Sequence, residues 1–431
     1  MKHLKRTALV LMAAAMAFTA TACGSSGGSD AGSDGKLTMQ IWDNSQREAM
    51  QALADAYHEQ NPDVTIEVQV TSWSEYWTKL EAAAESNTLP DLFWMHTDQI
   101  LYYSEFGMLA DVTDLFPYEE HYSDISISNA QGSDGRMYGV PKDKDNICLV
   151  YNKEMFDAAG VAYPDETWTW DDLEAASQAI YDATGNYGYM AYNDEQLGYH
   201  NFVYQNGGCI LTEDKTKGGF DQEATREAVK YYVGLQDNDW CPDQAYFAET
   251  SPGTGFFSGK GAMFLEGSWN LLSEMNNYPD MVGKWDIAVL PAAPNPVSGD
   301  GRATISNGLT YATGAHGKNL EIALDVLEFF AGEEAQRIQG ESGAAIPAYE
   351  GLEETWISAF SKFDYQLDLE AIMSQFDYCV QYVNNSARPK WKSGVVDIMT
   401  SIYNGTVDID TGLDQIQELI NTETAKKLAD S

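Results

Sequence analysis

Residues 36–41 read KLTMQI and residues 64–70 read VTIEVQV, two segments in which apolar and polar residues alternate. Alternation with a period of two is typical of a β-strand that buries one face. Between these segments, apolar residues recur at helical spacing and a proline ends the pattern: Met50, Leu53, Ala54, Tyr57 and Pro62. A second helix and a short strand at 91–94 follow. Strands and helices that alternate at this pace predict an α/β fold with a mostly parallel sheet.

The chain leaves this first unit after residue 141. Residues 147–151 form an apolar run typical of a buried strand. Thr169, followed by Asp172, has the pattern of a capping box at the start of a helix. Later helices are predicted at 222–236, 268–276, 318–332, 333–342 and 411–429. The length of the chain is sufficient for two or three ordinary domains.

Residues 1–22 have the pattern of a secretory signal peptide. Three basic residues precede the uncharged run Ala8–Phe18, which is too short to span a bilayer, and small residues precede Cys23. Cys23 and the glycine- and serine-rich segment after it resemble a bacterial lipoprotein box, although Ala20 stands where that box usually has an aliphatic residue. We therefore expect residues 23–35 to be a lipidated cysteine and its linker. Acyl chains on Cys23 would hold the secreted protein at the outer face of the cytoplasmic membrane.

The charge of the chain is strongly acidic, with 25 Lys and Arg against 66 Asp and Glu and a net charge of −41. Such a surface repels nucleic acid and gives a phosphate ligand no general attraction, so no nucleic-acid partner is expected. A neutral ligand is compatible with this charge. The 44% of hydrophobic and 12% of aromatic residues indicate a folded chain rather than an acidic disordered one.

Four cysteines follow the lipoprotein cysteine. Cys209 comes after two glycines and Cys241 comes before a proline, so both are expected at the edges of loops. A disulfide between Cys209 and Cys241 is predicted, because an extracellular location permits it, with two free thiols as the open alternative. Cys148, in a strand, and Cys379, in a helical segment, are expected to be buried free thiols.

Catalytic motifs are absent from the sequence or incomplete. The one Gly-x-Ser-x-Gly pattern, at 24–28, lies in the linker rather than in a strand-to-helix turn. A possible calcium loop has Cys148 where such a loop needs glycine. The six histidines are scattered without the spacing of a metal site. The sequence therefore predicts no catalytic residue, metal or cofactor, but a carboxylate pair of the glycosidase type stays open among so many acidic residues.

Several segments, in chain order, resemble the extracellular sugar-binding proteins of ATP-driven importers, of the maltose-binding type. They are QIW at 40–42, DLFWMH at 91–96, YGVP at 138–141, LVYNK at 149–153, FSGKGAM at 257–263 and GSW at 267–269. The resemblance covers essentially the whole chain after the signal. It implies a two-lobed periplasmic-binding-protein fold with a ligand in the cleft between the lobes. Lobe one would be 37–141 plus 304–345, and lobe two 142–303 plus 346–431.

The resemblance also implies which residues meet the ligand. A sugar has apolar C–H faces that aromatic rings cover, and hydroxyls that carboxylates, amides and arginine bind. The positions that match ligand contacts of the family are Asn44, Gln46, Arg47, Trp94, Asp98, Asp145, Trp269, Arg388 and Trp391. Trp42 is instead interpreted as a core residue of the first strand, and Glu195 and Tyr199 are possible contacts without an assigned role.

Together these features predict a lipid-anchored binding protein that captures a sugar and delivers it to the permease of an ABC importer. An oligosaccharide is favoured by the 11 tryptophans and 25 tyrosines of the chain. The protein is expected to be a monomer and not an enzyme. A secreted glycosidase that uses a carboxylate pair is the alternative.

Overall fold

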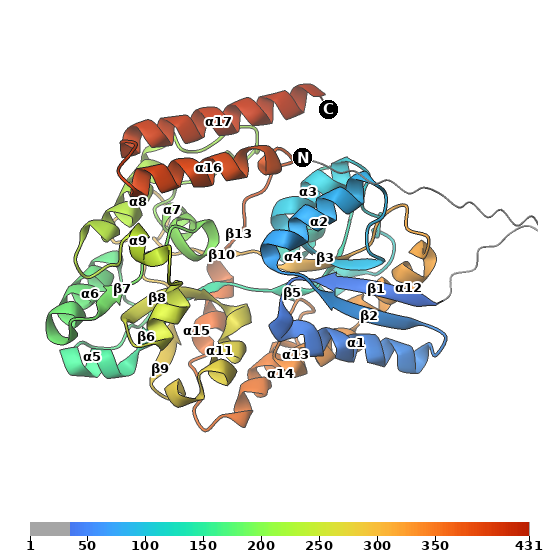
Figure 1. Ribbon diagram of the computed structural model, residues 1–431, viewed down its shortest axis with the longest axis horizontal. Helices are drawn as coiled ribbons and strands as arrows, with labels where there is room; N and C mark the ends of the chain where they lie inside the picture. Colours follow the sequence, from blue (N-terminus) through green and yellow to red (C-terminus); the bar gives the residue numbers. More distant parts are fainter. Residues whose placement is uncertain (1–34, 431) are drawn as a thin grey trace, which may run out of the picture. The chain divides into compact units, whose positions relative to one another are not determined.

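Two α/β lobes, each with its own β-sheet and joined by crossing strands, make up the folded part of the chain (Figure 1). This computed structural model describes residues 35–430, so the predicted signal peptide and Cys23 lie outside the described residues. Both lobes belong to one unit that begins at Gly35. Among the described residues, no helix has the length and apolar character that crossing a membrane requires.

The first lobe is built on a five-stranded sheet in the order β2-β1-β3-β11-β4. Its strands are β1 (Lys36–Ile41), β2 (Thr65–Val70), β3 (Leu92–His96), β4 (Val140–Pro141) and β11 (Leu309–Ala312). Strand β1 runs parallel to β2 and β3, as predicted, whereas β11 is antiparallel to β3 and β4. The sheet is mixed because a strand from much later in the chain enters it between β3 and β4.

Helices from both parts of the chain cover this sheet. They are η1 (Asn44–Gln46), α1 (Arg47–Gln60), α2 (Trp73–Glu85), α3 (Thr97–Glu105), η2 (Tyr118–Glu120), α4 (Asp124–Ala130), α12 (Leu320–Ala331) and α13 (Glu333–Ser342). Leu53 of α1 and Val326 of α12 share one apolar core with Met39 of β1. Burial of these apolar side chains stabilises the lobe.

The second lobe contains a four-stranded sheet in the order β7-β8-β6-β9. Its strands are β6 (Ile147–Asn152), β7 (Tyr187–Tyr189), β8 (Gly261–Gly267) and β9 (Trp285–Ala288). Strand β6 is antiparallel to β8 and β9, and only β7 and β8 pair in parallel. The expectation of mostly parallel strands is therefore wrong for this sheet. The direction of these strands depends on the long segments that connect them, and the sequences of those segments show no hydrophobic periodicity from which the direction could be predicted.

Helices make up most of the second lobe. They are α5 (Lys153–Ala159), α6 (Trp170–Thr184), η3 (Glu195–Tyr199), α7 (His200–Gln205), α8 (Glu223–Gly234), η4 (Leu235–Asp237), α9 (Gln244–Phe247), α10 (Pro252–Phe257), η5 (Ser268–Asn270), α11 (Leu271–Asn277), η6 (Pro279–Met281), α14 (Glu353–Ala359), η7 (Phe360–Lys362), α15 (Glu370–Met373), η8 (Ser374–Tyr378), α16 (Arg388–Tyr403) and α17 (Ile409–Asp430). The predicted capping box of Thr169 and Asp172 is present at the start of α6.

Two short strand pairs lie where the chain passes between the lobes. Strand β5 (Asp143–Lys144) pairs with β12 (Ile346–Pro347), and β10 (Thr304–Ser306) pairs with β13 (Cys379–Gln381). Cys379 therefore opens a strand and not the helix that the sequence predicted. These segments bring residues from distant parts of the chain to the space between the lobes.

The predicted disulfide is contradicted, because Cys209 and Cys241 are both free thiols. Cys209 Sγ accepts a hydrogen bond of 3.1 Å from Gln222 Nε2, whereas Cys241 is buried in the core of the second lobe, where its sulfur lies 3.6 Å from the carbonyl oxygen of Pro242. A disulfide needs both Cα atoms within about 7 Å and side chains that point toward each other. The expected positions of the two cysteines at loop edges indicated that they would be exposed, but not that their Cα atoms would be close together. Cys148 is free and buried, as predicted.

Candidate functional site

A cleft of about 360 Å³ lies between the lobes, beside the ends of β1 and β3 and the crossing segments. Twelve residues line it: Trp42, Asp43, Gln46, Trp73, His96, Asp143, Asp145, Gln196, Trp269, Asn270, Asn307 and Leu309. Small-molecule sites commonly have volumes of about 300–1,000 Å³ and combine apolar surface with a few placed polar groups. Aromatic rings, amides and carboxylates meet in this cleft in that way.

The wall from the first lobe is aromatic. The ring of Trp42 lies edge-on to the rings of Trp73 and Tyr76, with centroids 5.1 and 5.0 Å away. Trp73, at the start of α2, is 43% exposed. A large and partly exposed aromatic surface of this kind favours contact with an apolar face of a ligand. The carboxyl ends of parallel strands share one edge of a sheet, which is why the segments after β1 and β2 bring these rings together.

One sequence prediction for this wall is wrong and another is incomplete. Trp94, predicted to contact the ligand, is fully buried in the core of the first lobe, with Lys142 Nζ 4.6 Å from its ring centroid. Trp42, predicted to be a core residue, is partly buried against that core and also lines the cleft. Trp94 lies inside β3, and its side chain packs in the apolar core that the sheet shares with α1 and α12. Strand β1 ends at Ile41, and Trp42 is the first residue beyond it.

The polar floor of the cleft is organised around a buried lysine. Lys142 Nζ donates a hydrogen bond of 2.9 Å to Gln46 Oε1 and pairs with Asp143 Oδ2 at 2.6 Å. Asp145 Oδ1 accepts a hydrogen bond of 2.6 Å from the backbone N–H of Asn307. Gln46 and Asp145 thus lie at the cleft, where the sequence placed them. The crossing segments hold Gln46 through the side chain of Lys142 and Asp145 through the backbone N–H of Asn307, which pre-organises the floor.

Burial raises the pKa of Asp145 to about 7, and the neighbouring Asp143 adds to this effect. The unfolded chain has an ordinary aspartate pKa of about 4, so folding favours the protonated form. The corresponding stability is fully present below pH 4 and is lost as the pH rises through 7. We expect the free energy of unfolding to fall between pH 5 and pH 8. The fall is up to about 1.4 kcal/mol for each pH unit between 5 and the folded-state pKa of Asp145. Urea unfolding at both pH values measures this loss.

The Asp145→Asn variant keeps an oxygen that accepts from the backbone N–H but does not titrate. Its stability is expected to fall less between pH 5 and pH 8 than that of the wild type. Asp165→Asn is the control, because Asp165 is exposed and hydrogen bonds from Thr167 lower its pKa. An equal fall in wild type and Asp145→Asn would contradict the prediction.

The wall from the second lobe is formed by Trp269 and Asn270 in η5, directly after β8. Trp269 lies at the cleft, as the sequence predicted. A Cβ atom on Gly267 would come within 2.2 Å of the Trp269 ring, so this glycine allows the indole to lie over the backbone. The buried Glu266 accepts hydrogen bonds from Asn270 Nδ2 at 2.9 Å and from the N–H of Gly267 at 2.8 Å. These contacts hold the loop in place.

Three predicted contacts near the C-terminus and in α3 are buried instead. Trp391 is fully buried in the core of the second lobe, and its Nε1 donates to Asn385 Oδ1 at 3.1 Å, which contradicts a stacking role. Asp98 and Arg388 are 1% and 0% exposed and bind each other. The face of α16 that carries Arg388 and Trp391 packs into the protein, and helical spacing alone does not reveal which face that is.

Asn44 and Arg47, the remaining predicted contacts, are exposed beside the cleft but do not line it. Other lining residues were missed by sequence reasoning. Trp73 had a usable signal, because it follows β2 at the same sheet edge as Trp42. Asn307 and Leu309 had none, because they come from a crossing segment whose position depends on the assembled lobes.

The chain resembles bacterial binding proteins in sequence. Residues 43–337 match the family model described as bacterial extracellular solute-binding protein. The chain is 24% identical over 367 residues to the galactooligosaccharide-binding protein of Bacillus subtilis, covering 82% of each chain. It is 26% identical over 347 residues to the maltodextrin-binding protein of the same organism, covering 77% of each.

A solved structure has the same architecture. The ABC substrate-binding protein of Listeria monocytogenes, in complex with cycloalternan, superposes with a TM-score of 0.80 at 23% identity, covering 90% of this chain and 99% of that one. This likeness confirms the predicted two-lobed periplasmic-binding-protein fold.

Proposed function

This chain belongs to the bacterial extracellular solute-binding protein family, and we propose that it captures a sugar, of the oligosaccharide class, in the cleft between its lobes. The observation that carries the proposal is the pair of tryptophans that the two lobes contribute to one cleft, Trp42 and Trp269. Indole rings cover the apolar C–H faces of a sugar, and the carboxylates and amides between them suit its hydroxyls. Relatives named for galactooligosaccharide and maltodextrin binding support this class of solute.

Capture is favoured over hydrolysis for two reasons. The family is described as solute-binding proteins, and Asp143 and Asp145, two of the three carboxylates that line the cleft, accept hydrogen bonds from the protein itself. Asp143 Oδ1 accepts from the N–H of Leu309 at 2.7 Å, and Asp145 Oδ1 from that of Asn307 at 2.6 Å. We propose delivery of the captured sugar to the permease of an ABC importer by a monomeric protein. The proposed lobe boundaries are 37–141 plus 304–345 and 142–303 plus 346–431.

A calorimetric screen of the exported protein tests this function. Malto-oligosaccharides, galacto-oligosaccharides, arabino-oligosaccharides, chitobiose derivatives and their monosaccharides form the panel. At least one oligosaccharide is expected to bind with micromolar affinity or better, which corresponds to about −8 kcal/mol. The bound sugar should be recovered intact by chromatography. Release of reducing ends would support the glycosidase alternative, and a panel without binding would contradict the proposed solute class.

We also propose that Cys23 carries the lipid anchor, on the basis of the signal-like segment before it. The Cys23→Ala variant is expected to move from the membrane fraction to the medium, because two or more acyl chains are needed for stable anchoring. Fractionation of expressing cells followed by immunoblotting measures this. Cys209→Ala is the matched control and should stay with the membrane. Membrane retention of Cys23→Ala would show that another segment holds the protein.

A further inference from the structure

A buried ion bridge joins the two lobes next to the cleft. Asp98, at the start of α3 in the first lobe, is 1% exposed. Its Oδ2 lies 2.7 Å from Lys392 Nζ and 3.4 Å from Arg388 Nε, both on α16 of the second lobe. Its Oδ1 lies 2.8 Å from His96 Nδ1. One carboxylate of the first lobe is thus bound by two cationic side chains of the second.

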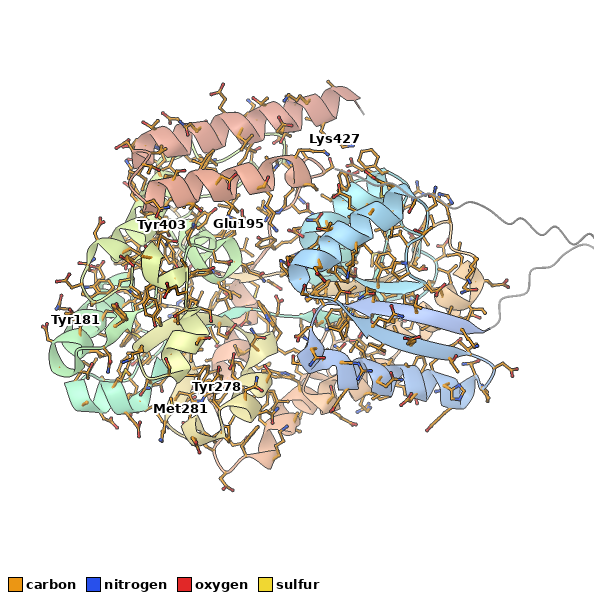
Figure 2. The ribbon with its side chains drawn as sticks, viewed as in Figure 1. Tyr181, Glu195, Tyr278, Met281, Tyr403 and Lys427 are labelled. Atoms are coloured by element: carbon orange, nitrogen blue, oxygen red, sulfur yellow. The ribbon has the colours of Figure 1, made fainter. Side chains whose placement is uncertain are left out.

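The second lobe holds its side of the bridge in place by itself. Arg388 Nη2 bonds Glu195 Oε2 at 2.5 Å and Tyr382 Oη at 2.8 Å. The guanidinium carbon also lies 5.0 and 4.9 Å from the ring centroids of Tyr382 and Trp391. Glu195 is labelled in Figure 2, beneath α16. If the lobes separated, Arg388 would keep Glu195, whereas Asp98 would lose both of its cationic partners.

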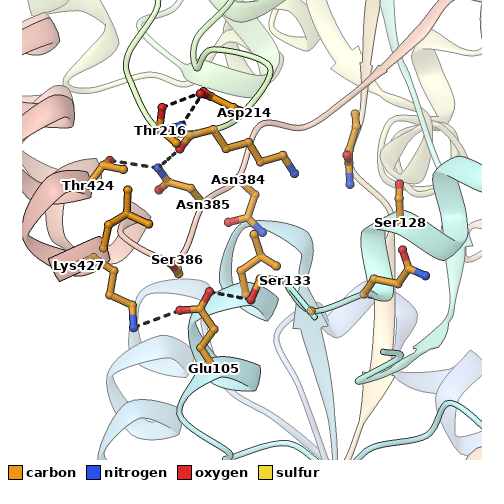
Figure 3. Close-up of a pocket in the computed structure, with 16 residues that line it drawn as sticks. Glu105, Ser128, Ser133, Asp214, Thr216, Asn384, Asn385, Ser386, Thr424 and Lys427 are labelled. Atoms are coloured by element: carbon orange, nitrogen blue, oxygen red, sulfur yellow. Dashed lines mark hydrogen bonds and ion pairs between the residues drawn. The ribbon is translucent and has the colours of Figure 1, made fainter. Parts of the chain in front are cut away.

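Residues that are close in sequence to the bridge line two cavities. His96 and Gln196, near Asp98 and Glu195 in the chain, line the cleft. Leu101 and Asn384 are among the residues that line a second cavity of about 400 Å³, shown in Figure 3.

Further contacts attach α3 to the second lobe along its length. Asn384 Nδ2 donates to the carbonyl oxygen of Thr97 at the start of the helix. Lys427 Nζ of α17 pairs with Glu105 Oε2 at the end of the helix, at 3.1 Å, as drawn in Figure 3. Lys427 and Glu105 are partly exposed, and such pairs contribute little. The buried bridge at Asp98 is the contact with the larger expected effect.

We propose that Asp98 is a positioning residue, which, with Arg388 and Lys392, holds the two lobes together before any solute binds and does not itself touch the solute. The importance of this bridge for sugar capture rests on the proposed function. The effect of the bridge on the position of the lobes does not depend on that function. When the binding-competent state is already populated without ligand, less binding free energy is spent on the conformational change, so the apparent affinity is higher. Weakening the bridge shifts the ligand-free population toward separated lobes.

The test uses the exported chain with Cys23→Ala in every variant, so that no acyl chain causes association, purified without solute, and small-angle scattering. Asp98→Asn removes the charge but keeps the shape of the side chain, and its radius of gyration is expected to exceed that of the wild type beyond the measurement error. Lys392→Gln, whose lysine side chain is 33% exposed, is expected to change the radius in the same direction and serves as the test if Asp98→Asn does not fold. Asp111→Asn is the matched control, because Asp111 pairs with Arg136 within the first lobe.

A radius of gyration that stays at the wild-type value in Asp98→Asn and in Lys392→Gln would overturn the proposal. So would an Asp98→Asn variant with an unchanged radius and weakened binding of an oligosaccharide found in the panel, because that result would make Asp98 a direct contact. The scattering measurement needs no solute. A negative result for the bridge is therefore distinguishable from a negative result for the proposed sugar binding.

Discussion

Replacing Arg388 with methionine is expected to lower the free energy of unfolding by about 3–5 kcal/mol, the usual cost of removing one partner from a buried ion pair. Arg388 is fully buried and contacts both Glu195 and Asp98. Burial by itself would raise the pKa of Glu195, but the charges around it, Arg388 first, hold that pKa at about 2. The methionine variant would leave Glu195 buried without its main cationic partner.

The pH dependence of stability provides a second measurement on Arg388→Met. A depressed pKa of Glu195 contributes stability above the unfolded value of about 4, and this stability is lost as the pH falls toward 2. The variant should lose less stability than the wild type over that range, because it has already lost the pairing. Arg226→Met is the control: Arg226 pairs with Asp410 and Asp414 at the surface, and such pairs contribute about 0–1 kcal/mol. Urea unfolding that gives Arg388→Met a loss as small as that of the control would contradict the prediction.

Replacing Trp269 with alanine is expected to weaken oligosaccharide binding at least tenfold, which corresponds to about 1.4 kcal/mol. The indole ring lines the cleft, and covering one sugar face contributes through apolar burial and aromatic contact. Calorimetry with an oligosaccharide from the panel measures the change in affinity. The fold should persist, because Trp269 is only partly buried.

Trp168→Ala is the matched control for Trp269. Trp168 is also a partly buried tryptophan of the second lobe, but it packs against Phe156 with ring centroids 6.0 Å apart and does not line the cleft. Its removal should leave affinity unchanged. If Trp269→Ala binds as tightly as Trp168→Ala while both are folded, Trp269 is not part of the binding site.

Local sequence patterns determined the elements that depend on near neighbours. The alternation in β1 and β2 and the capping box of α6 were predicted correctly, because each involves residues a few positions apart. Trp269, which the resemblance implied as a ligand contact, lines the cleft, and its role in binding stays a prediction. Here the absence of a side chain at 267 makes room for the ring at 269. These features have physical causes that lie within the segment itself.

Only the tertiary structure decided which residues face the cleft and which are buried. Trp42 and Trp94 are both tryptophans at the first sheet. They differ because Trp94 packs in the core that the sheet shares with helices from distant parts of the chain, whereas Trp42 lies beyond the end of β1. Asp98 and Arg388 looked like ligand contacts by position, but they are nearly 300 residues apart and bind each other across the lobes. Cys209 and Cys241 had positions that suited a disulfide, yet they lie in different surroundings. In each case the outcome depends on contacts between distant segments, and local periodicity contains no information about these contacts.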